Sequence, residues 1–533
     1  MLSEGVLRGL VGMQCVTVLG LVGLLCCSSV GTVRGGKIVV MPVDGSHWLS
    51  MKILVEELSQ KGHEMVVLVP EANYHIRNGS YTTRTFKVPY TVADLDASLD
   101  IIKKGTLEAP GLLDVPKTFE MIMNFTEMQV KGCESLLYDE PLMRSLQEQD
   151  FDLMLTDPFL PCGTIIADAF SIPAVYFLRG MVCGLDLEAA QCPSPPSYVP
   201  RLFTGNTDAM TFPQRVKNML MVGVELILCK TFYGSFDELA SRYLKKDTTY
   251  KQLLGHGAVW FMRYDYMFEY PRPLMPNMVM VGGLNCAKKK PLPVDLEEFV
   301  NGSGEHGFIV FTLGSMVSEL PEVKAKEFFD AFRQIPQRVL WRYTGVVPKD
   351  APKNVKLMKW LPQNDLLAHP KAKAFITHGG THGLYEGICN GVPMVMIPLF
   401  GDQGDNVQRM VARGVAETLN IYDITSEKLL VALRKVIHDK SYKEKMMKLS
   451  AIHRDRPIEP LDLAVFWTEF VMRHKGADHL RPAAHDLNWV QYHSLDVIGF
   501  LLLILVTVMF VTFKSCMFCF RRCLRKSQKK KNE

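Results

Sequence analysis

The chain has 533 residues, more than one ordinary hydrophobic core accommodates, so two domains with appended segments are expected. Hydrophobic residues make up 48% of it and charged residues 22%, as in folded proteins and unlike disordered ones. The net charge of +4 is concentrated after Phe513, where the tail carries about +7. The rest of the chain then carries about −3, which lacks the basic excess that nucleic-acid binding requires, so no nucleic-acid partner is expected.

Two apolar runs bracket the chain. The first follows Arg8 and ends in small residues, which predicts a secretory signal peptide over residues 1–34; an uncleaved anchor is the alternative. The second, residues 497–513, has no charge and forms roughly 25 Å of helix, which suits the thin ER membrane. Trp489 and Tyr492 in the juxtamembrane segment 476–496 are typical interfacial anchors. The basic tail, residues 514–533, then faces the cytosol, and the body faces the lumen.

The last four residues, Lys530-Lys531-Asn532-Glu533, resemble the dilysine retrieval signal of ER-resident type I membrane proteins. A random basic tail can end in the same way, but together with a signal peptide and one span this ending favours the ER membrane. Asn78, Asn124 and Asn301 each begin a glycosylation sequon that a lumenal body can use.

Thirteen cysteines are unevenly placed along the chain. Three lie in the signal segment, and Cys516, Cys519 and Cys523 follow the span, where they are candidates for palmitoylation. The remaining seven are scattered, odd in number and without metal-like spacing, so neither a disulfide framework nor a metal site is predicted from them.

Residues 35–285 begin with the strand-loop-helix alternation of a doubly wound α/β domain. A strand at 37–41 leads through a loop, 42–50, into a helix that Gly62 ends, and a second strand follows at 65–69. Another strand, 153–155, runs into Asp157. Stretches rich in Met, Phe and Leu, such as residues 210–235, are interpreted as helices and loops over a pocket.

Residues 286–475 show the same alternation of strands, loops and helices. Strands are predicted at 308–313, 339–343, 356–360, 374–377, 393–398 and 415–419, with a helix near 464–474. We therefore expect two Rossmann-like doubly wound domains that face each other across a cleft, with ligands at the carboxyl ends of the strands.

The densest run of chemically active side chains lies in the second domain. It comprises Trp360, Gln363, the segment Thr377-His378-Gly379-Gly380-Thr381-His382-Gly383, Glu386, Asp402 and Gln403. Glycines between a strand and a helix let backbone N–H groups approach a phosphate, which the helix dipole also favours. An aromatic ring at a strand end offers a flat face to a base, and a carboxylate one turn into the helix can accept hydrogen bonds from ribose.

This run resembles the signature of the UDP-glycosyltransferase superfamily, which has the GT-B fold. Two further segments, Gly45-Ser46-His47-Trp48 and Leu155 to Cys162, resemble the UDP-glucuronosyltransferases specifically. The resemblance implies that Trp360 stacks on uracil, Gln363 contacts the nucleoside and Glu386 holds the ribose. It also implies a diphosphate site formed by Ser315, His378, Gly380, His382 and Gly383. The sugar hydroxyls would be bound by Asp402 and Gln403.

Two residues are candidates for the transfer step itself. His47 and Asp157 follow two strands at the same sheet edge, where an imidazole can act as base and a carboxylate can fix its tautomer. Both match the catalytic positions of the resembled family. The expected reaction is an inverting, metal-independent transfer of glucuronic acid from UDP-glucuronate, a co-substrate and not a bound cofactor, to small lipophilic acceptors.

Several competing interpretations exist. His378 and His382 have the spacing of a metal pair but lack an evident third ligand, and Asp94-Leu95-Asp96 is expected in a solvated loop. A G-x-G-x-x-G pattern at Gly302 to Gly307 precedes a strand, so it fails the context of a dinucleotide site.

Glucuronate as the donor sugar depends on the resemblance, because no residue must bind its carboxylate; Arg263 is a candidate that can equally form a surface pair. The alternatives are a UDP-glucosyl- or galactosyltransferase of the same fold, or a UDP-sugar-binding subunit without catalysis. The sequence leaves homo- or hetero-oligomers open.

Overall fold

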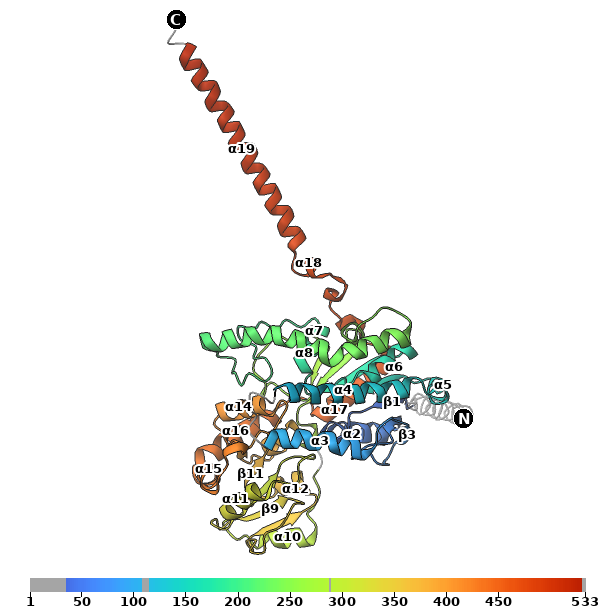
Figure 1. Cartoon of the computed structure of the whole chain (residues 1–533), viewed down its shortest axis with the longest axis vertical. Helices are drawn as coiled ribbons and strands as arrows, with labels where there is room; N and C mark the ends of the chain where they lie inside the picture. The colour runs from blue at the N-terminus through green and yellow to red at the C-terminus, as the bar shows by residue number, and fades with distance from the viewer. Residues whose placement is uncertain (1–34, 108–114, 287–288, 530–533) are drawn as a thin grey trace, which may run out of the picture. The chain divides into compact units, whose positions relative to one another are not determined.

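The computed structural model describes residues 35–107, 115–286 and 289–529 (Figure 1). The predicted signal peptide, residues 1–34, and the two lysines of the dilysine ending, Lys530 and Lys531, lie outside the described residues. The described chain forms a body up to Asp478 and a separate C-terminal unit from His479 onward.

The N-terminal half of the body contains a sheet of seven parallel strands in the order β3-β2-β1-β4-β5-β6-β7. The strands are β1 (Lys37–Met41), β2 (Glu64–Pro70), β3 (Thr82–Phe86), β4 (Leu153–Thr156), β5 (Ala174–Leu178), β6 (Val259–Met262) and β7 (Met278–Met280). Val40 of β1 pairs with Val67 on one side and Leu155 on the other, and all three are buried. The strand order reverses between β1 and β4, the point where such sheets bind ligands.

The C-terminal half contains six parallel strands in the order β10-β9-β8-β11-β12-β13. They are β8 (Phe308–Thr312), β9 (Arg338–Arg342), β10 (Val355–Met358), β11 (Ala372–Thr377), β12 (Met394–Met396) and β13 (Ala416–Thr418). Here the order reverses between β8 and β11. The prediction of two doubly wound α/β domains is confirmed, and all six predicted strands of this half are present within a few residues.

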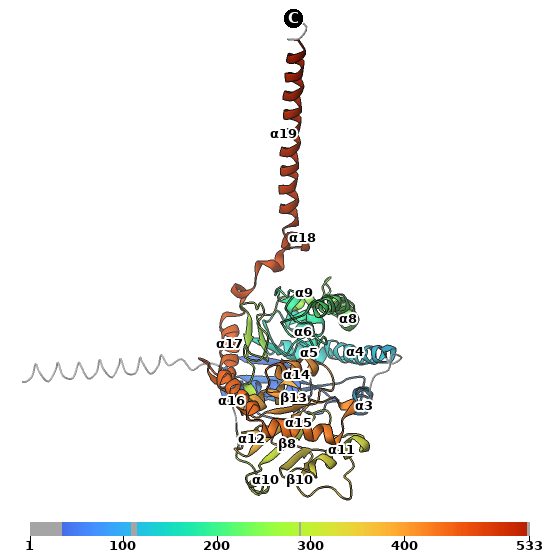
Figure 2. The same cartoon turned by 90° about the vertical axis from the view of Figure 1, so that its left-hand side faces the viewer.

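Helices connect the strands in both halves (Figures 1 and 2). In the first half they are α2 (Ser46–Gln60), α3 (Val92–Leu107), α4 (Val115–Leu137), α5 (Glu140–Gln147), α6 (Cys162–Phe170), α7 (Leu185–Ala189), α8 (Phe212–Leu244) and α9 (Tyr250–Leu254). In the second half they are α10 (Val294–Asn301), α11 (Glu322–Phe332), α12 (Gln363–Ala368), α13 (Thr381–Cys389), α14 (Gln403–Ala412), α15 (Ser426–His438) and α16 (Lys440–Arg454).

The last helix of the body, α17 (Pro460–His474), returns to the N-terminal half and packs against α2 and β6 (Figures 1 and 2). Its Glu469 lies 3.4 Å from Nε2 of the buried His63. Just beyond its end, Lys475 Nζ lies 2.6 Å from Asp152 Oδ1. The chain thus crosses between the two halves twice.

Two local predictions for the first half were wrong. The expected loop 42–50 is shorter, because Gly45 adopts a φ of 80° that turns the chain directly into α2 at Ser46. His47 therefore lies in the first turn of a helix. The pair Asp94 and Asp96 lies in helix α3 and not in a loop, although both side chains are exposed as expected.

Three disulfides link the body, so the prediction that it has no disulfide framework was wrong. The pairs are Cys133–Cys162, Cys183–Cys229 and Cys286–Cys389, with sequence separations of 29, 46 and 103 residues. Their partners meet only through tertiary packing, which is why spacing did not reveal them. Cys192 is the odd cysteine, and it is free and buried.

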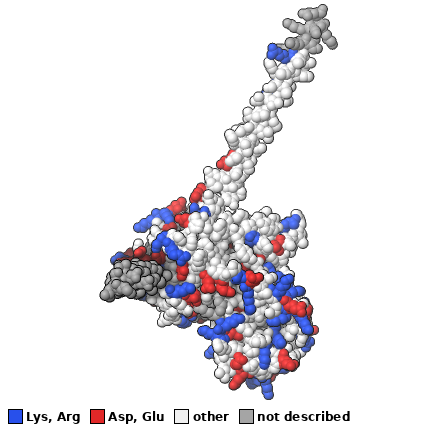
Figure 3. Space-filling model, turned by 180° about the vertical axis from the view of Figure 1, so that it is seen from behind, with Lys and Arg blue, Asp and Glu red and all other residues white. Residues whose placement is uncertain are grey.

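The C-terminal unit consists mainly of a short helix, α18 (Trp489–Tyr492), and a long one, α19 (Leu495–Lys529). The predicted span, residues 497–513, lies wholly within α19 and is exposed along its length. Figure 3 shows α19 as a rod without charge over its middle part. Helix α8 is also long and apolar enough to cross a membrane, but it buries Asn218 and Glu225 inside the body. The apolar α19 is accordingly the candidate membrane anchor.

Candidate active site

A cavity of about 750 Å³ lies between the carboxyl ends of the two sheets. Its lining includes His47 and every predicted donor-site residue, namely Ser315, Trp360, Gln363, His378, Gly380, His382, Gly383, Glu386, Asp402 and Gln403. Of the predicted site residues only Asp157 is not part of the wall, because it is 1% exposed and lies behind His47. The structure therefore brings the predicted catalytic pair and the predicted donor-site residues to one cavity.

His47 and Asp157 form a hydrogen-bonded pair. His47 Nδ1 lies 2.7 Å from Asp157 Oδ2, and the imidazole is 29% exposed toward the cavity. The other carboxylate oxygen, Asp157 Oδ1, accepts a 3.0 Å hydrogen bond from the backbone N–H of Phe159. The ring of Phe159 stands edge-on to the imidazole at 5.7 Å. Because Nδ1 is engaged, Nε2 is the nitrogen left for a ligand.

The N-terminus of α13 forms the wall around His378. Gly380 caps the helix without a side chain, and the imidazole of His378 fills the space beside it. A Cβ at Gly380 or at Gly314 would lie 2.6 Å from His378 Nε2, so both positions require glycine for the ring to fit. Burial lowers the pKa of His378 to about 4, which Asp402 only partly opposes. The imidazole is neutral at pH 7 and can donate a hydrogen bond to an anion without carrying charge.

Ser315 and Trp360 are linked through Arg342, which ends β9. The Arg342 guanidinium donates to the backbone carbonyl oxygen of Ser315 at 3.1 Å and lies 5.3 Å from the Trp360 ring centroid. Trp360 is 51% exposed and lines the cavity, which is unusual for so large an apolar ring. The Ser315 hydroxyl has no hydrogen-bond partner among the described residues, so it is free to bind a ligand oxygen.

A series of polar contacts connects Gln363, in the C-terminal half of the cavity wall, with the N-terminal domain. Gln363 Nε2 donates to Glu386 Oε2, and Glu386 Oε1 lies 3.3 Å from His382 Nε2. His382 Nδ1 in turn lies 2.9 Å from Ser50 Oγ of α2. Glycine at position 383 leaves room for Gln363, since a Cβ there would lie 2.9 Å from Gln363 Nε2. Sequence reasoning missed Ser50, because nothing local indicates that α2 meets α13.

Asp402 and Gln403 begin α14 at the other end of the cavity. Gln403 Oε1 accepts hydrogen bonds from the backbone N–H groups of Leu399, at 2.8 Å, and Phe400, at 3.1 Å, so it orders the turn before the helix. Asp402 occupies the N-cap position but makes no capping hydrogen bond with its side chain. Its Oδ2 instead accepts from Asn406 Nδ2 at 2.8 Å. The carboxylate is thus held on one side and faces the cavity.

Arg263, at the end of β6, also lines the cavity and is not a surface residue. It is only 7% exposed, and its Nη1 donates to Ser50 Oγ at 3.0 Å. No carboxylate of the described residues lies within ion-pair distance of its guanidinium, and its Nε has no hydrogen-bond partner there. Burial lowers the pKa of Arg263, although Asp157 and Asp402 oppose the effect. A buried guanidinium without an ion-pair partner is costly, so Arg263 is a candidate for binding an anionic group.

A family model described as UDP-glucoronosyl and UDP-glucosyl transferase matches residues 36–530. The chain is 55% identical to UDP-glucuronosyltransferase 1A1 of Rattus norvegicus over 516 residues, which cover 95% of this chain and 96% of the relative. It is 55% identical to UDP-glucuronosyltransferase 1A1 of Homo sapiens over 511 residues, which cover 96% of each. The chain belongs to the UDP-glucuronosyltransferase family.

A UDP-glucuronosyltransferase of Pleuronectes platessa is 57% identical over 468 residues, which cover 87% of this chain and 99% of the relative. Among solved structures, the glycosyltransferase VinC in complex with DTDP is similar with a TM-score of 0.55 and 19% identity, covering 83% of this chain and all of VinC. The calicheamicin glycosyltransferase CalG4 has a TM-score of 0.54 and 16% identity, covering 83% of this chain and 99% of CalG4. These structures show that this UDP-glucuronosyltransferase has the GT-B fold.

A second cavity, of about 190 Å³, adjoins the first in the N-terminal domain of this UDP-glucuronosyltransferase. Phe159 and Met316 belong to the walls of both cavities. Most of its lining is apolar or aromatic, with Tyr74, Phe86, Tyr90, Phe125, Leu160 and Phe236 among the residues. An apolar cavity next to an imidazole fits a lipophilic molecule with one reactive polar group.

The three sequon asparagines, Asn78, Asn124 and Asn301, are all exposed. Asn124 lies in the middle of α4, and its sequon partner Thr126 is buried and donates to the carbonyl oxygen of Ile122 at 2.8 Å. Asn301 ends α10, where its Nδ2 donates to Glu297 Oε1 at 2.8 Å.

Proposed function

We propose that the chain is an ER-membrane enzyme whose lumenal body transfers glucuronic acid from UDP-glucuronate to hydroxyl groups of small lipophilic acceptors, with inversion. His47 serves as the general base and Asp157 as its orienting partner. The single observation that carries the proposal is the 2.7 Å contact between these two side chains in the wall of the cavity that also holds the glycine-rich N-terminus of α13.

The transfer is a single in-line displacement. His47 Nε2 removes the proton from the acceptor hydroxyl as its oxygen attacks the anomeric carbon, and the bond to the UDP oxygen breaks. Asp157 accepts a hydrogen bond from Nδ1–H, which selects the tautomer with Nε2 free and stabilises the imidazolium that forms. One displacement at the anomeric carbon converts the α-linked donor sugar into a β-glucuronide.

The departing diphosphate is stabilised by groups that carry no full charge. Backbone N–H groups at the start of α13 and the hydroxyl of Ser315 donate to phosphate oxygens. His378, neutral because burial lowers its pKa to about 4, donates through a ring nitrogen. Trp360 stacks on the uracil and Glu386 binds the ribose; Gln363, His382, Gly380 and Gly383 shape this end of the site.

Recognition of glucuronate rather than glucose is assigned to Arg263. Its guanidinium is buried in the cavity wall without a carboxylate partner among the described residues, and the donor sugar carries one carboxylate. Asp402 and Gln403 bind the neutral hydroxyl groups. A neutral hexose leaves the guanidinium of Arg263 unpaired, which makes its binding less favourable.

The acceptor binds in the apolar cavity of about 190 Å³, which adjoins the main cavity at Phe159. Its aromatic and aliphatic walls favour lipophilic molecules, and the adjacent imidazole determines which hydroxyl reacts.

Three features support a lumenal body anchored by α19. Disulfides form and persist in oxidising compartments, and the body has three. The sequon asparagines are exposed. The basic residues that follow the apolar part of α19 favour a cytosolic tail by the positive-inside rule.

The proposal is tested by offering the full-length protein in detergent UDP-glucuronate, UDP-glucose and UDP-galactose with one phenolic acceptor. A β-glucuronide is the expected main product. A glucoside or galactoside as the main product favours the alternative transferases, whereas tight binding of UDP-sugars without any product favours a non-catalytic subunit.

A further inference from the structure

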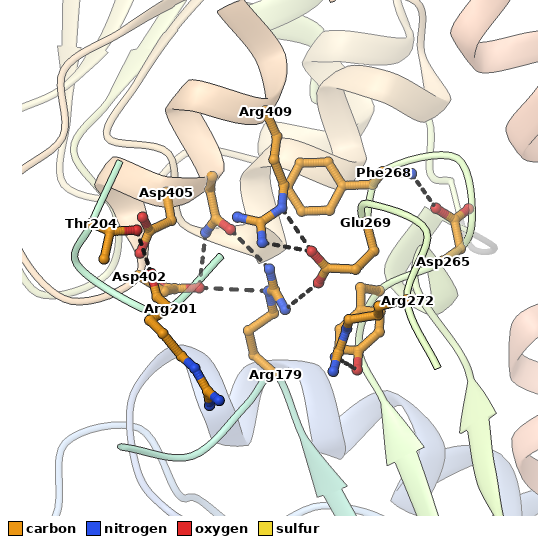
Figure 4. Close-up of polar contacts among 12 residues, drawn as sticks. Arg179, Arg201, Thr204, Asp265, Phe268, Glu269, Arg272, Asp402, Asp405 and Arg409 are labelled. Carbon is orange, nitrogen blue, oxygen red and sulfur yellow. Dashed lines mark hydrogen bonds and ion pairs between the residues drawn. The ribbon is translucent and has the colours of Figure 1, made fainter. Parts of the chain in front are cut away.

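A cluster of charged side chains joins the two domains beside Asp402 (Figure 4). Arg179 directly follows β5, and Glu269 lies in the segment after β6, so both come from the N-terminal domain. Asn406 and Arg409 lie on α14 of the C-terminal domain, one and two turns after Asp402. The cluster is built around the helix that begins with two predicted sugar-binding residues.

Glu269 bridges the two arginines. Its Oε2 accepts a 3.0 Å hydrogen bond from Arg179 Nη1, and its Oε1 accepts a 2.7 Å hydrogen bond from Arg409 Nε. Burial alone would raise the pKa of Glu269, but the guanidinium groups of Arg179, Arg409 and Arg272 outweigh it and lower the pKa to about 2. Glu269 is therefore ionised at pH 7, and each arginine has a fixed orientation.

Arg179 reaches from Glu269 to the Asp402 carboxylate. Its Nη2 donates to Asn406 Oδ1 at 3.1 Å, and its Nε lies 3.6 Å from Asp402 Oδ2. Asn406 Nδ2 donates to the same Asp402 oxygen at 2.8 Å and to the carbonyl oxygen of Gly379 at 3.1 Å. The Arg179 guanidinium lies 4.8 Å from the ring centroid of Tyr264, which further restricts it. The three neighbours that orient the Arg179 guanidinium toward Asp402, namely Glu269, Asn406 and Tyr264, are all buried.

Asp402 itself is only partly covered. Its side chain is 34% exposed and lines the cavity, while Glu269 and Arg409 are less than 10% exposed. The contacts found for its carboxylate involve Oδ2, so Oδ1 is the oxygen left for a ligand. A buried ion network is weak evidence for stability, but it fixes geometry well because a displaced charge would lose its partners.

We propose that Arg179 and Glu269 are positioning residues for donor-sugar recognition, which act across the domain interface by holding the Asp402 carboxylate in the orientation that binds the sugar hydroxyls. The inference rests on the proposed function, in which Asp402 binds the sugar. The nucleotide part of the donor binds at Trp360 and Glu386. The cluster reaches the diphosphate turn only through the hydrogen bond from Asn406 to Gly379, so it should affect binding of the sugar much more than binding of UDP.

The first test is Glu269→Gln in the full-length protein, since the amide keeps the shape and removes the charge. We expect the KM for UDP-glucuronate to rise about tenfold, while the inhibition constant of UDP changes by less than about twofold. The KM for the acceptor stays unchanged. Equal weakening of UDP and UDP-glucuronate overturns the inference, because a merely structural role affects both ligands alike.

A double-mutant cycle tests whether the effect passes through Asp402. Asp402→Asn raises the KM for UDP-glucuronate by itself, and adding Glu269→Gln to it should raise the KM by less than about twofold further. If the two effects multiply fully, Glu269 acts independently of Asp402 and the inference is wrong.

Arg179→Lys is the second variant, used also if Glu269→Gln does not fold. A lysine keeps one charge for Glu269 but cannot contact Asn406 and Asp402 in the same geometry. We expect the same selective rise in the KM for UDP-glucuronate; an unchanged KM overturns the inference.

Asp405→Asn is the matched control. Asp405 lies on the same helix and contacts the N-terminal domain, accepting from the backbone N–H groups of Phe203 at 2.7 Å and Gly205 at 3.0 Å. Among the described residues no hydrogen bond or ion pair joins its side chain to Asp402, and only a longer-range charge interaction connects the two. Its variant should therefore change the KM for UDP-glucuronate by less than about twofold. A rise equal to that of Glu269→Gln overturns the inference, because any change at the interface would then suffice.

The inference and the proposed function can fail separately. If the wild type uses a neutral UDP-hexose, the proposed donor is wrong, and the same comparison between that donor and UDP still tests Arg179 and Glu269.

Discussion

His47 Nδ1 lies 2.7 Å from Asp157 Oδ2, and the two residues follow β1 and β4, the neighbouring strands between which the order of the first sheet reverses. The diphosphate-binding candidates Ser315 and His378 follow β8 and β11, which flank the reversal in the second sheet. The cavity therefore lies between two switch points, each of which opens a crevice at the carboxyl ends of its strands.

Asp157→Asn should reduce turnover by about 10²–10⁴-fold with an aliphatic alcohol, because the amide no longer selects the tautomer with a free Nε2. Phenols ionise near pKa 10, so they need the base less and should show a smaller loss. The measurement is kcat for the two acceptor classes. An equal loss for both would mean that Asp157 supports the fold rather than the base.

Trp360→Ala should weaken UDP binding by about 1–3 kcal/mol, the usual contribution of one base stacked on an aromatic ring. The inhibition constant of UDP measures this directly. Trp489→Ala is the matched control, because Trp489 is also an exposed tryptophan but lies in the C-terminal unit. An unchanged inhibition constant for Trp360→Ala contradicts the stacking role.

His378 should make stability depend on pH. Burial lowers its pKa from 6.5 to about 4, so the unfolded state binds its proton first as the pH falls. The folded state keeps this contribution above pH 6.5 and loses it between pH 6.5 and 4, to a total of roughly 3 kcal/mol.

The comparison is the free energy of unfolding of wild type and His378→Gln at pH 7 and pH 5. The wild type should lose more stability than the variant over this interval. His438→Gln, which changes an exposed histidine at the end of α15, should behave like wild type. A parallel loss in wild type and His378→Gln contradicts the depressed pKa.

Peptide mapping without reduction should recover the links Cys133–Cys162, Cys183–Cys229 and Cys286–Cys389, with Cys192 free. Replacing Cys286 with Ser should destabilise the protein by about 2–5 kcal/mol, whereas Cys192→Ala should cost less because it breaks no link. A peptide linked to Cys192 would contradict the pairing.

The sequence alone predicted the elements whose signal is local. The central strand β1 is a continuous apolar run, and the turn after β11 carries its glycines and histidines within a few residues of each other. The edge strand β3 is mostly polar and exposed, so it has no apolar signature and was missed. The short strands β5, β6 and β7 lie among apolar segments that have no clear periodicity.

The relationships that sequence could not supply are those between distant segments. Ser50 meets His382 across 332 residues, and Arg179 meets Asn406 across 227. Arg263 was a candidate by charge alone, and its burial without a carboxylate partner became visible only once β6 was placed against the cavity. The cysteine pairs depend on packing in the same way.

The most direct measurement of the central claim is the identity and anomeric configuration of the product from UDP-α-glucuronate and an aliphatic alcohol, with wild type and His47→Ala side by side. The account predicts a β-glucuronide from the wild type and a loss of at least about 100-fold in kcat for His47→Ala. An α-glucuronide, or full turnover by His47→Ala, would contradict it.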